Sequence, residues 1–374
     1  MSRGVVLSLF CVSLVLMAAD WPTFRGDPQQ TGVAAPLPQQ VEVLWKVTLP
    51  DSVEATAAII GDTVYVAGMD ENLYALSLAD GKLKWKYKAE GSIKASPAAR
   101  QMKVQENGKE KSTLCLFFGD QEGGFHCVDA ATGTKRWVVK TDAEIISSAN
   151  FADDKVLFGS YDEHLYCVHP ADGKLLWKFK SQGPINSAPA IVNDRAFVAG
   201  CDSTLRMVNI KDGTEINNVE LGAQAGASAA VAGDLAFVGN MDRSVLGIDW
   251  KTGKIAWEYQ HPRKNYAFYS SPAVAGDLVI VGGRDKLVHG IDARTGAQRW
   301  EFATRGKVDS SPVVAGERVF VGSMDGSLYV LDLKTGKKLQ EFPLGSAVTA
   351  SPAVGGDRLV IGTQDGVVYC LGAK

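Results

Sequence analysis

A tryptophan that recurs every 40 residues constrains this chain more than any other feature of its sequence. Trp45 and Trp85 are 40 residues apart, and so are Trp137 and Trp177. The segments that end in these side chains read as a strand, a tight turn and a second strand, as in LYALSLADGKLKW at 73–85 and LYCVHPADGKLLW at 165–177. Self-similarity at a fixed period of this length is the signature of a repeat architecture.

Following this spacing of about 40 residues along the chain gives eight equivalent positions, of which six are tryptophan. They are Trp45, Trp85, Trp137, Trp177, Asn217, Trp257, Trp300 and Gln340. The step from Trp85 to Trp137 is 52 residues, because an insertion rich in Lys, Glu and Gln lies near Arg100–Ser112. The other steps are nearly uniform, so we expect eight copies of one structural unit.

Each repeat reads as four short strands separated by Gly- and Asp-containing turns, the pattern of an all-β array. The first strand of each consists of small residues, as in Ser96-Pro97-Ala98 and Ser271-Pro272-Ala273. Small residues fit strands that converge on a common axis, and proline is tolerated where such a strand is an edge. The sequence therefore predicts an all-β fold, an eight-bladed β-propeller of four-stranded blades.

The two ends of the repeat region predict how the ring closes. The last repeat ends at Leu371 after three strands, whereas the strand-like segment Val43–Val47 precedes any first strand. We expect the N-terminal strand to complete the last blade, which removes the open edge between the first and last blades.

The chain divides into a signal peptide, a leader and the propeller. Residues 1–19 read as a signal peptide, with Arg3, the apolar run Val5–Met17 and the small residues Ala18-Ala19. A retained membrane anchor is the alternative for this segment. Residues 20–41 form an extended leader, which either docks on the propeller or is a plain linker, and 42–374 form the propeller. We accordingly expect a periplasmic or secreted protein, without a transmembrane segment in the mature chain.

Composition excludes several classes of function. The formal net charge of −3 gives no reason to expect nucleic-acid binding. The five cysteines beyond the signal peptide include no adjacent pair and no Cys-x-x-Cys, although Cys115 and Cys127 could face each other across a hairpin. The five histidines are scattered, without the spacing of metal ligands. We assign no catalytic residue and no metal site.

The run Asp-x-x-Thr-Gly-x-x-x-Trp, as in DAATGTKRW at 129–137 and DARTGAQRW at 292–300, resembles the repeat of pyrroloquinoline quinone (PQQ)-type propellers. The resemblance covers about Val43 to Leu371. It implies that each tryptophan packs on the adjacent blade near the Thr-Gly turn. This gives a structural docking role to Trp45, Trp85, Trp137, Trp177, Trp257 and Trp300.

The family divides into quinone-dependent dehydrogenases and non-catalytic periplasmic proteins similar to BamB, an outer-membrane assembly factor. The dehydrogenase branch uses an adjacent Cys-Cys pair and calcium ligands near the axis, and this sequence shows neither. We therefore expect no cofactor, with PQQ as an unsupported possibility. The predicted function is a monomeric, non-enzymatic scaffold that binds a protein partner in the cell envelope. The alternatives are a PQQ-binding oxidoreductase or sensor, and a carbohydrate-binding propeller.

Candidate binding residues come from positions where the repeats differ. The residue two before each first strand should lie at one mouth of the central channel, and these residues are Glu54, Lys94, Ile146, Asn186, Gly226, Tyr269, Asp309 and Thr349. The enlarged connection 259–269 adds Arg263, Lys264, Tyr266 and Phe268, an aromatic and basic composition typical of interfaces. A solvated rim and a packed loop are the alternatives.

Acidic residues form a second ring, in the turn between the second and third strands of each repeat. The members are Asp70, Glu122, Asp162, Asp202, Asp242, Asp285, Asp325 and Asp365. Calcium binding is one interpretation, but Asp in a tight turn also accepts local backbone hydrogen bonds. Because the positions are spread around the whole circumference, we predict a structural role.

Overall fold

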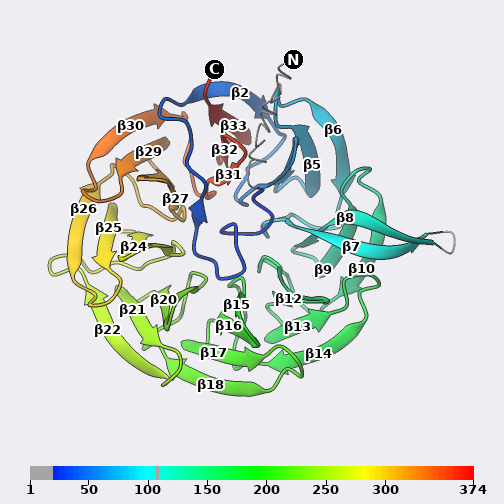
Figure 1. Ribbon diagram of the computed structural model, residues 1–374, viewed down its shortest axis with the longest axis horizontal. Coiled ribbons are helices and arrows are strands. Elements are labelled where there is room, and N and C mark those ends of the chain that lie inside the picture. Colours follow the sequence, from blue (N-terminus) through cyan, green and yellow to red (C-terminus); the bar gives the residue numbers. More distant parts are fainter. Residues whose placement is uncertain (1–19, 107–108) are drawn as a thin grey trace, which may run out of the picture.

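The computed structural model describes residues 20–106 and 109–374. The signal peptide and anchor interpretations of residues 1–19 lie outside this range. The described residues form eight sheets around a central axis, which confirms the predicted eight-bladed propeller (Figure 1). In this part of the chain there is no helix with the length and apolarity needed to cross a membrane.

The first four blades follow one another along the chain. Blade 1 contains β3 (Ala58–Ile60), β4 (Thr63–Ala67), β5 (Asn72–Ser77) and β6 (Leu83–Lys88). Blade 2 contains β7 (Ala98–Glu106), β8 (Lys109–Gly119), β9 (Gly124–Asp129) and β10 (Lys135–Lys140). Blade 3 contains β11 (Asn150–Ala152), β12 (Lys155–Gly159), β13 (His164–Val168) and β14 (Leu175–Lys180). Blade 4 contains β15 (Ala190–Val192), β16 (Arg195–Ala199), β17 (Thr204–Asn209) and β18 (Glu215–Glu220).

The remaining blades repeat this order, except for the last. Blade 5 contains β19 (Ala230–Ala232), β20 (Leu235–Gly239), β21 (Ser244–Asp249) and β22 (Lys254–Gln260). Blade 6 contains β23 (Ala273–Ala275), β24 (Leu278–Gly282), β25 (Leu287–Asp292) and β26 (Gln298–Ala303). Blade 7 contains β27 (Val313–Ala315), β28 (Arg318–Gly322), β29 (Ser327–Asp332) and β30 (Lys338–Pro343), with β1 (Val33–Ala34) added at its inner edge. Blade 8 contains β31 (Ala353–Gly355), β32 (Arg358–Gly362), β33 (Val367–Gly372) and β2 (Glu42–Thr48).

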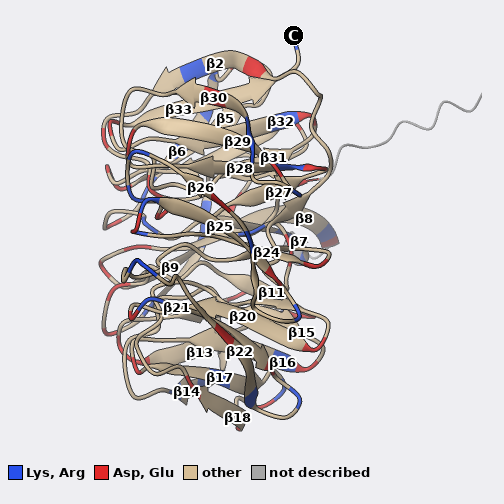
Figure 2. Ribbon diagram, turned by 90° about the vertical axis from the view of Figure 1, so that its left-hand side faces the viewer, with Lys and Arg blue, Asp and Glu red and all other residues tan. Residues whose placement is uncertain are grey.

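Burial explains why the middle strands of each blade are almost entirely apolar. The second and third strands lie between the sheets of the two neighbouring blades, so both of their faces are covered, as in β24, where every residue is buried. The outermost strand alternates instead, and in β14 Lys178 and Lys180 are exposed. Charged residues accordingly lie mainly in the turns and along the outer strands (Figure 2). Lysines on an outer edge discourage pairing with other chains.

The N-terminal strand closes the ring as predicted. β2 pairs antiparallel with β33, with Trp45 opposite Cys370. The Trp45 indole N–H then donates to the carbonyl of Leu78 in blade 1, at 2.9 Å. A strand from one end of the repeat region therefore joins blade 8 to blade 1.

All six tryptophans at the docking position make the same contact with the next blade, in which the indole N–H donates to a carbonyl just after the third strand. Besides Trp45, the pairs are Trp85–Ala130, Trp137–Pro170, Trp177–Ile210, Trp257–Ala293 and Trp300–Leu333, at 3.0–3.1 Å. The ring also covers the turn glycine of that blade. A Cβ on Gly213, where φ is +76°, would lie 2.6 Å from the Trp177 ring. Only glycine provides both this backbone conformation and the space for the indole.

Blade 4 has Asn217 at the docking position, and blade 5 compensates. Trp250 of blade 5 packs against Phe197 of blade 4, with ring centroids 5.7 Å apart, and donates to the carbonyl of Gly233 at 3.0 Å. The aromatic ring at this seam thus comes from the opposite side. At the blade 7–blade 8 seam, Gln340 donates to the carbonyl of Val41 at 3.1 Å.

Closure by β2 predicts a large effect of Trp45→Ala. The substitution removes the indole from the seam between blades 8 and 1, and we expect it to lower the free energy of unfolding by about 3 kcal/mol, within the range for truncation of large packed side chains. Denaturant unfolding measures this change, with Trp177→Ala as a reference at an internal seam. A Trp45 variant as stable as the unmodified protein would contradict closure through this contact.

Candidate functional site: the open end of the central channel

Serine hydroxyls join the innermost strands around the axis. The backbone N–H of one blade donates to the hydroxyl at the same position of the next, at 2.8–3.0 Å. The pairs are Thr56–Ser96, Ser96–Ser148, Ala188–Ser228, Ser228–Ser271, Ser271–Ser311 and Ser311–Ser351. Between blades 3 and 4, where Ala188 has no hydroxyl, Ser147 donates to the carbonyl of Ser187 instead, at 2.7 Å. The small first strands that the sequence shows are therefore a rigid wall around a narrow channel.

The leader closes one end of this channel. Its backbone carbonyls accept N–H groups from the innermost strands of six blades, namely those of Ile59, Ala99, Ile191, Val231, Val274 and Val314, at 2.7–3.0 Å. Figure 1 views the molecule from this side and shows the leader crossing the centre of the ring. Of the two interpretations of residues 20–41, docking on the propeller is the one that the structure supports.

Arg25 anchors the leader within the ring. Its guanidinium is buried, and Nη2 donates to the carbonyls of Pro272 and Pro312. These carbonyls precede the inner strands of blades 6 and 7. Burial lowers the pKa of Arg25 to about 9, an effect that the charge of Asp27 partly opposes, so the side chain remains a cation at neutral pH.

The opposite end of the channel is open and forms a cup of about 480 Å³. Phe24 of the leader lines it, together with the serine positions of the inner strands and all eight mouth residues expected from the sequence. The structure thus brings Glu54, Lys94, Asn186, Tyr269 and Asp309 together around one opening. Their role in binding remains a proposal.

Charges at the mouth are paired with one another. Lys94 lies 3.0 Å from Glu54 on the neighbouring blade. On the other side of the ring, Arg284 makes two hydrogen bonds to the carboxylate of Asp309, at 3.0 and 2.8 Å, and its guanidinium carbon lies 3.7 Å from the ring centroid of Tyr269. The mouth therefore presents fixed polar groups without a net excess of either sign among these four charges.

Arg284 is the main mouth residue that the sequence interpretation missed. It stands one position before the acidic residue in the turn between the second and third strands of blade 6. The residues at that position also vary among repeats, and Met324 and Gln364 line the same cup. The comparison of repeats that found the first ring would have found this one.

In the enlarged connection 259–269, the structure differs from the prediction at one binding residue. Phe268 is buried at 2% exposure, because its ring packs against His289 and its Cβ lies beside Gly239, so it is not an exposed anchor. Tyr266 is 56% exposed and Arg263 is also exposed. Lys264 is half-buried and donates to the carbonyl of Asp285 at 3.0 Å.

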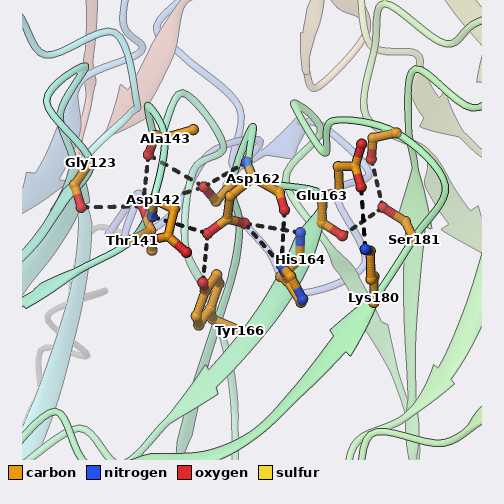
Figure 3. Close-up of polar contacts among 12 residues, drawn as sticks. Gly123, Thr141, Asp142, Ala143, Asp162, Glu163, His164, Tyr166, Lys180 and Ser181 are labelled. Carbon is orange, nitrogen blue, oxygen red and sulfur yellow. Dashed lines mark hydrogen bonds and ion pairs between the residues drawn. The ribbon is translucent and has the colours of Figure 1, made fainter.

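Local hydrogen bonds account for six members of the acidic ring, as Figure 3 shows for blade 3. In blades 2 and 5 the equivalent N–H groups donate to Asp120 and Asn240 instead of Glu122 and Asp242. The carboxylate of Asp162 accepts the N–H groups of His164 at 3.1 Å and Asp142 at 3.2 Å, and the hydroxyl of Tyr166 at 2.6 Å. Asp142 precedes the inner strand of the same blade, so the carboxylate joins two connections at the mouth face. Burial alone would raise the pKa of Asp162, but these hydrogen bonds outweigh it and lower the pKa below its usual value.

The residues of the channel do not match a quinone site of the dehydrogenase type. Among the described residues, no three His, Cys, Asp or Glu side chains are placed to hold a metal ion. The cations Lys94 and Arg284, which could meet the carboxylates of the quinone, are already paired with rim carboxylates. The five described cysteines are free thiols, and four of them are buried within blades.

Comparison with known proteins agrees with the class of fold. The repeated docking tryptophans and Thr-Gly turns define a propeller of PQQ-type repeats, and a model of the family described as outer membrane protein assembly factor BamB matches residues 32–117. A second model, described as the β-propeller of beta-alanine-activating enzyme, matches residues 104–372, which is more than half of the chain. The chain belongs to this second propeller family.

Solved structures show the same fold at low sequence identity. BamB from Moraxella catarrhalis superposes with a TM-score of 0.74 and 19% identity, covering 90% of this chain and 98% of that chain. The quinohemoprotein alcohol dehydrogenase ADHIIG from Pseudomonas putida HK5 superposes with a TM-score of 0.78 and 15% identity, covering 95% and 81%.

Similarity to curated sequences is confined to shorter segments. The chain is 26% identical to a polyvinylalcohol dehydrogenase from Sphingopyxis sp. (strain 113P3) over 121 residues, which is 31% of this chain and 18% of that protein. It is 30% identical to quinohemoprotein alcohol dehydrogenase ADH-IIG from Pseudomonas putida over 113 residues, or 28% and 15%. The chain therefore spans less than a fifth of the length of the curated relatives that it matches.

The lowered pKa of Asp162 predicts a defined pH dependence. Its contribution to stability is complete above the unfolded pKa of about 3.9 and is lost as the pH falls through the lower folded value. We expect Asp162→Asn to be less stable than the unmodified protein at pH 7 and to lose less stability on acidification below about pH 4. Denaturant unfolding at a series of pH values measures both, and parallel pH profiles for the two proteins would contradict the assignment.

Proposed function

We propose that this chain is a non-enzymatic propeller of the cell envelope, exported to the periplasm or secreted, which binds a protein partner on the face that contains the open channel mouth. The observation that carries the proposal is the difference between the two ends of the channel. The leader fills one end through hydrogen bonds to six blades, whereas the other end is open and rimmed by residues that differ from blade to blade. A rigid wall with variable residues at its opening is the usual construction of a binding surface.

The chemistry of the mouth supports recognition of a protein rather than catalysis. Its acids and bases are paired with each other, so none is set apart as a general acid or base. Tyr266 and Arg263 project from the adjoining connection as exposed residues of the types that dominate protein interfaces. The match of residues 32–117 to the BamB family model supports a place in the cell envelope and a protein partner. We further propose that the protein is a monomer.

Dehydrogenases match part of the chain, and they favour a second candidate function, that of a quinone-dependent oxidoreductase. The paired charges of the channel count against it. The third candidate, a carbohydrate-binding propeller, would stack a sugar on an aromatic ring of the mouth, and Arg284 already covers one face of Tyr269 at 3.7 Å.

The partner surface predicts the effect of changes at two exposed residues. In pull-downs from envelope extracts, the double variant Tyr266→Ala/Arg263→Glu should recover several-fold less of the protein captured by the unmodified chain, and its Tm should be nearly unchanged because both side chains are exposed. Leu83→Ala is the matched control, because Leu83 is 55% exposed and lies on an outer strand. Equal recovery by all three proteins would contradict docking on this face.

Absence of quinone chemistry is a separate prediction. After incubation with PQQ and calcium, the protein should show no alcohol- or sugar-dependent dye reduction above the quinone alone, because the channel lacks a set of calcium ligands among the described residues. Spectrophotometric assay of the dye provides the measurement. Turnover that a chelator abolishes would favour the oxidoreductase candidate instead.

A further inference from the structure

Four segments on the mouth face of blades 5–7 form one continuous surface, which we call the basic strip. It consists of residues 240–243, 261–269, 284–286 and 304–309, which are two turns and the two connections that follow them. Backbone hydrogen bonds of 2.9–3.1 Å join these segments in order, through the pairs Phe268–Asn240, Arg284–Ala267 and Thr304–Lys286. The strip is therefore fixed to the propeller along its whole length.

Most cations of the basic strip are free, which here means without an ion pair or a side-chain hydrogen bond among the described residues. The free ones are Arg243, Arg263, Lys286 and Lys307. Arg263, Lys286 and Lys307 are exposed, and Nε of Arg243 is buried without an acceptor in the described part of the chain. The engaged cations are in the pairs Arg284–Asp309, Arg305–Glu341 and Lys264 with the carbonyl of Asp285.

Carboxylates in and beside the strip do not supply partners for these free cations. Asp309 is paired with Arg284, and Asp285 lies 3.3 Å from Nε2 of His289. The exposed Asp242 is the one free carboxylate of the strip in the described chain. The neighbouring acids are engaged in the pairs Glu258–Ser244, Glu301–His261, Asp325–Arg305 and Glu341–Arg305, at 2.6–3.1 Å. Free cations thus outnumber free carboxylates on the strip.

The charge of the mouth face is reversed on the other side of the channel. The turns and connections of blades 1–3 at residues 69–71, 89–94, 120–123, 141–146 and 160–163 contain one cation, Lys94, which is paired with Glu54. Glu122 and Asp142 have no ion pair within the described ranges. An anionic membrane lying across the whole face would meet these carboxylates, whereas an acidic segment confined to blades 5–7 would not.

We propose that the partner bound by the mouth face is a protein that presents an acidic segment to the basic strip, where its carboxylates pair with Arg263, Lys286 and Lys307. This inference rests on the proposed function and names the chemistry of the partner. Tyr266, which is 56% exposed within the same strip, adds aromatic contact area. Complementary charge selects the partner and accelerates its encounter. Because the formal net charge of the chain is −3, the attraction arises from the strip and not from the protein as a whole.

Fluorescence anisotropy with labelled peptides measures this preference on residues 20–374, the leader and the propeller together. The probe is a peptide of about ten residues with alternating Glu and Ser, long enough when extended to reach across several turns. Its Kd should be at least ~10-fold lower than that of the corresponding Lys/Ser peptide at low ionic strength, with a smaller difference at higher salt. Equal Kd values for the two peptides would overturn the proposal.

Charge reversal locates the binding on the strip. Lys286→Glu/Lys307→Glu should weaken binding of the Glu/Ser peptide by ~10-fold or more with little change in Tm, because both side chains are exposed. Lys211→Glu/Lys254→Glu is the matched control, since it changes the net charge equally at exposed residues just after the third strand of blade 4 and at the start of the outer strand of blade 5. It should bind within ~2-fold of the unmodified protein, because salt screens distant charges. Lys286→Arg/Lys307→Arg keeps the charge and should bind normally. Normal binding by the charge-reversed strip variant would overturn the proposal.

Three outcomes separate this inference from the proposed function. Reduced partner recovery by Tyr266→Ala/Arg263→Glu together with equal binding of the two peptides would overturn the acidic segment and leave the proposed function intact. Equal recovery in those pull-downs would contradict the proposed function and this inference with it. Cosedimentation with phosphatidylglycerol vesicles that Lys286→Glu/Lys307→Glu abolishes would overturn the inference in favour of a membrane surface.

Discussion

Everything in this molecule depends on the seam between neighbouring blades, where an indole covers a glycine turn and donates to a carbonyl beside it. Each blade alone would expose both faces of an apolar sheet. Stacking against two neighbours buries these faces, but only if the blades keep a constant angle around the axis. The indole fixes that angle at the rim, and the serine-to-amide bonds fix it at the centre. Trp250 shows that the requirement is for an aromatic ring at the seam rather than for one sequence position.

The leader turns a symmetric ring into a molecule with two different faces. The inner strands present N–H groups toward one end of the channel, and an extended chain is the simplest structure that pairs with several of them in succession. Burial of Arg25 carries a cost, because only Nη2 of its guanidinium donates to propeller carbonyls, those of Pro272 and Pro312, and Nε and Nη1 have no hydrogen-bond partner among the described residues. Once that end is filled, the polar rim surrounds the end of the channel that stays open.

Comparison of equivalent positions in the eight repeats locates some of the candidate site residues but not their contacts. Positions that vary among repeats correctly indicated the mouth residues, because repeats with one backbone place equivalent residues at equivalent points. The same comparison would have shown that Phe268 points into the blade, because it stands one before the mouth residue, where the other repeats have the buried residues Val53, Ile93, Ile145, Ile185, Ala225, Val308 and Val348. It could not place Tyr266, which lies in the enlarged part of the connection. Nor could it show that Arg284 joins Asp309 and Tyr269, which are distant in the sequence and belong to two blades. The structural interpretation of the acidic ring agrees with the local hydrogen bonds of members such as Asp162, because the hydrogen bonds of an Asp in a tight turn are mostly local.

The sequence by itself determined the number of blades, the strands within them, the closure by the N-terminal strand and the spacing of the tryptophan docks. These follow from local periodicity and from turn residues whose conformational requirements are visible in one repeat. Only the tertiary structure decided that the leader fills one end of the channel, that the mouth charges are mutually paired, and that the second-repeat insertion forms a two-stranded ribbon beyond the rim. The physical reason is that these features rest on contacts between segments far apart in the chain, whose meeting depends on the closed ring.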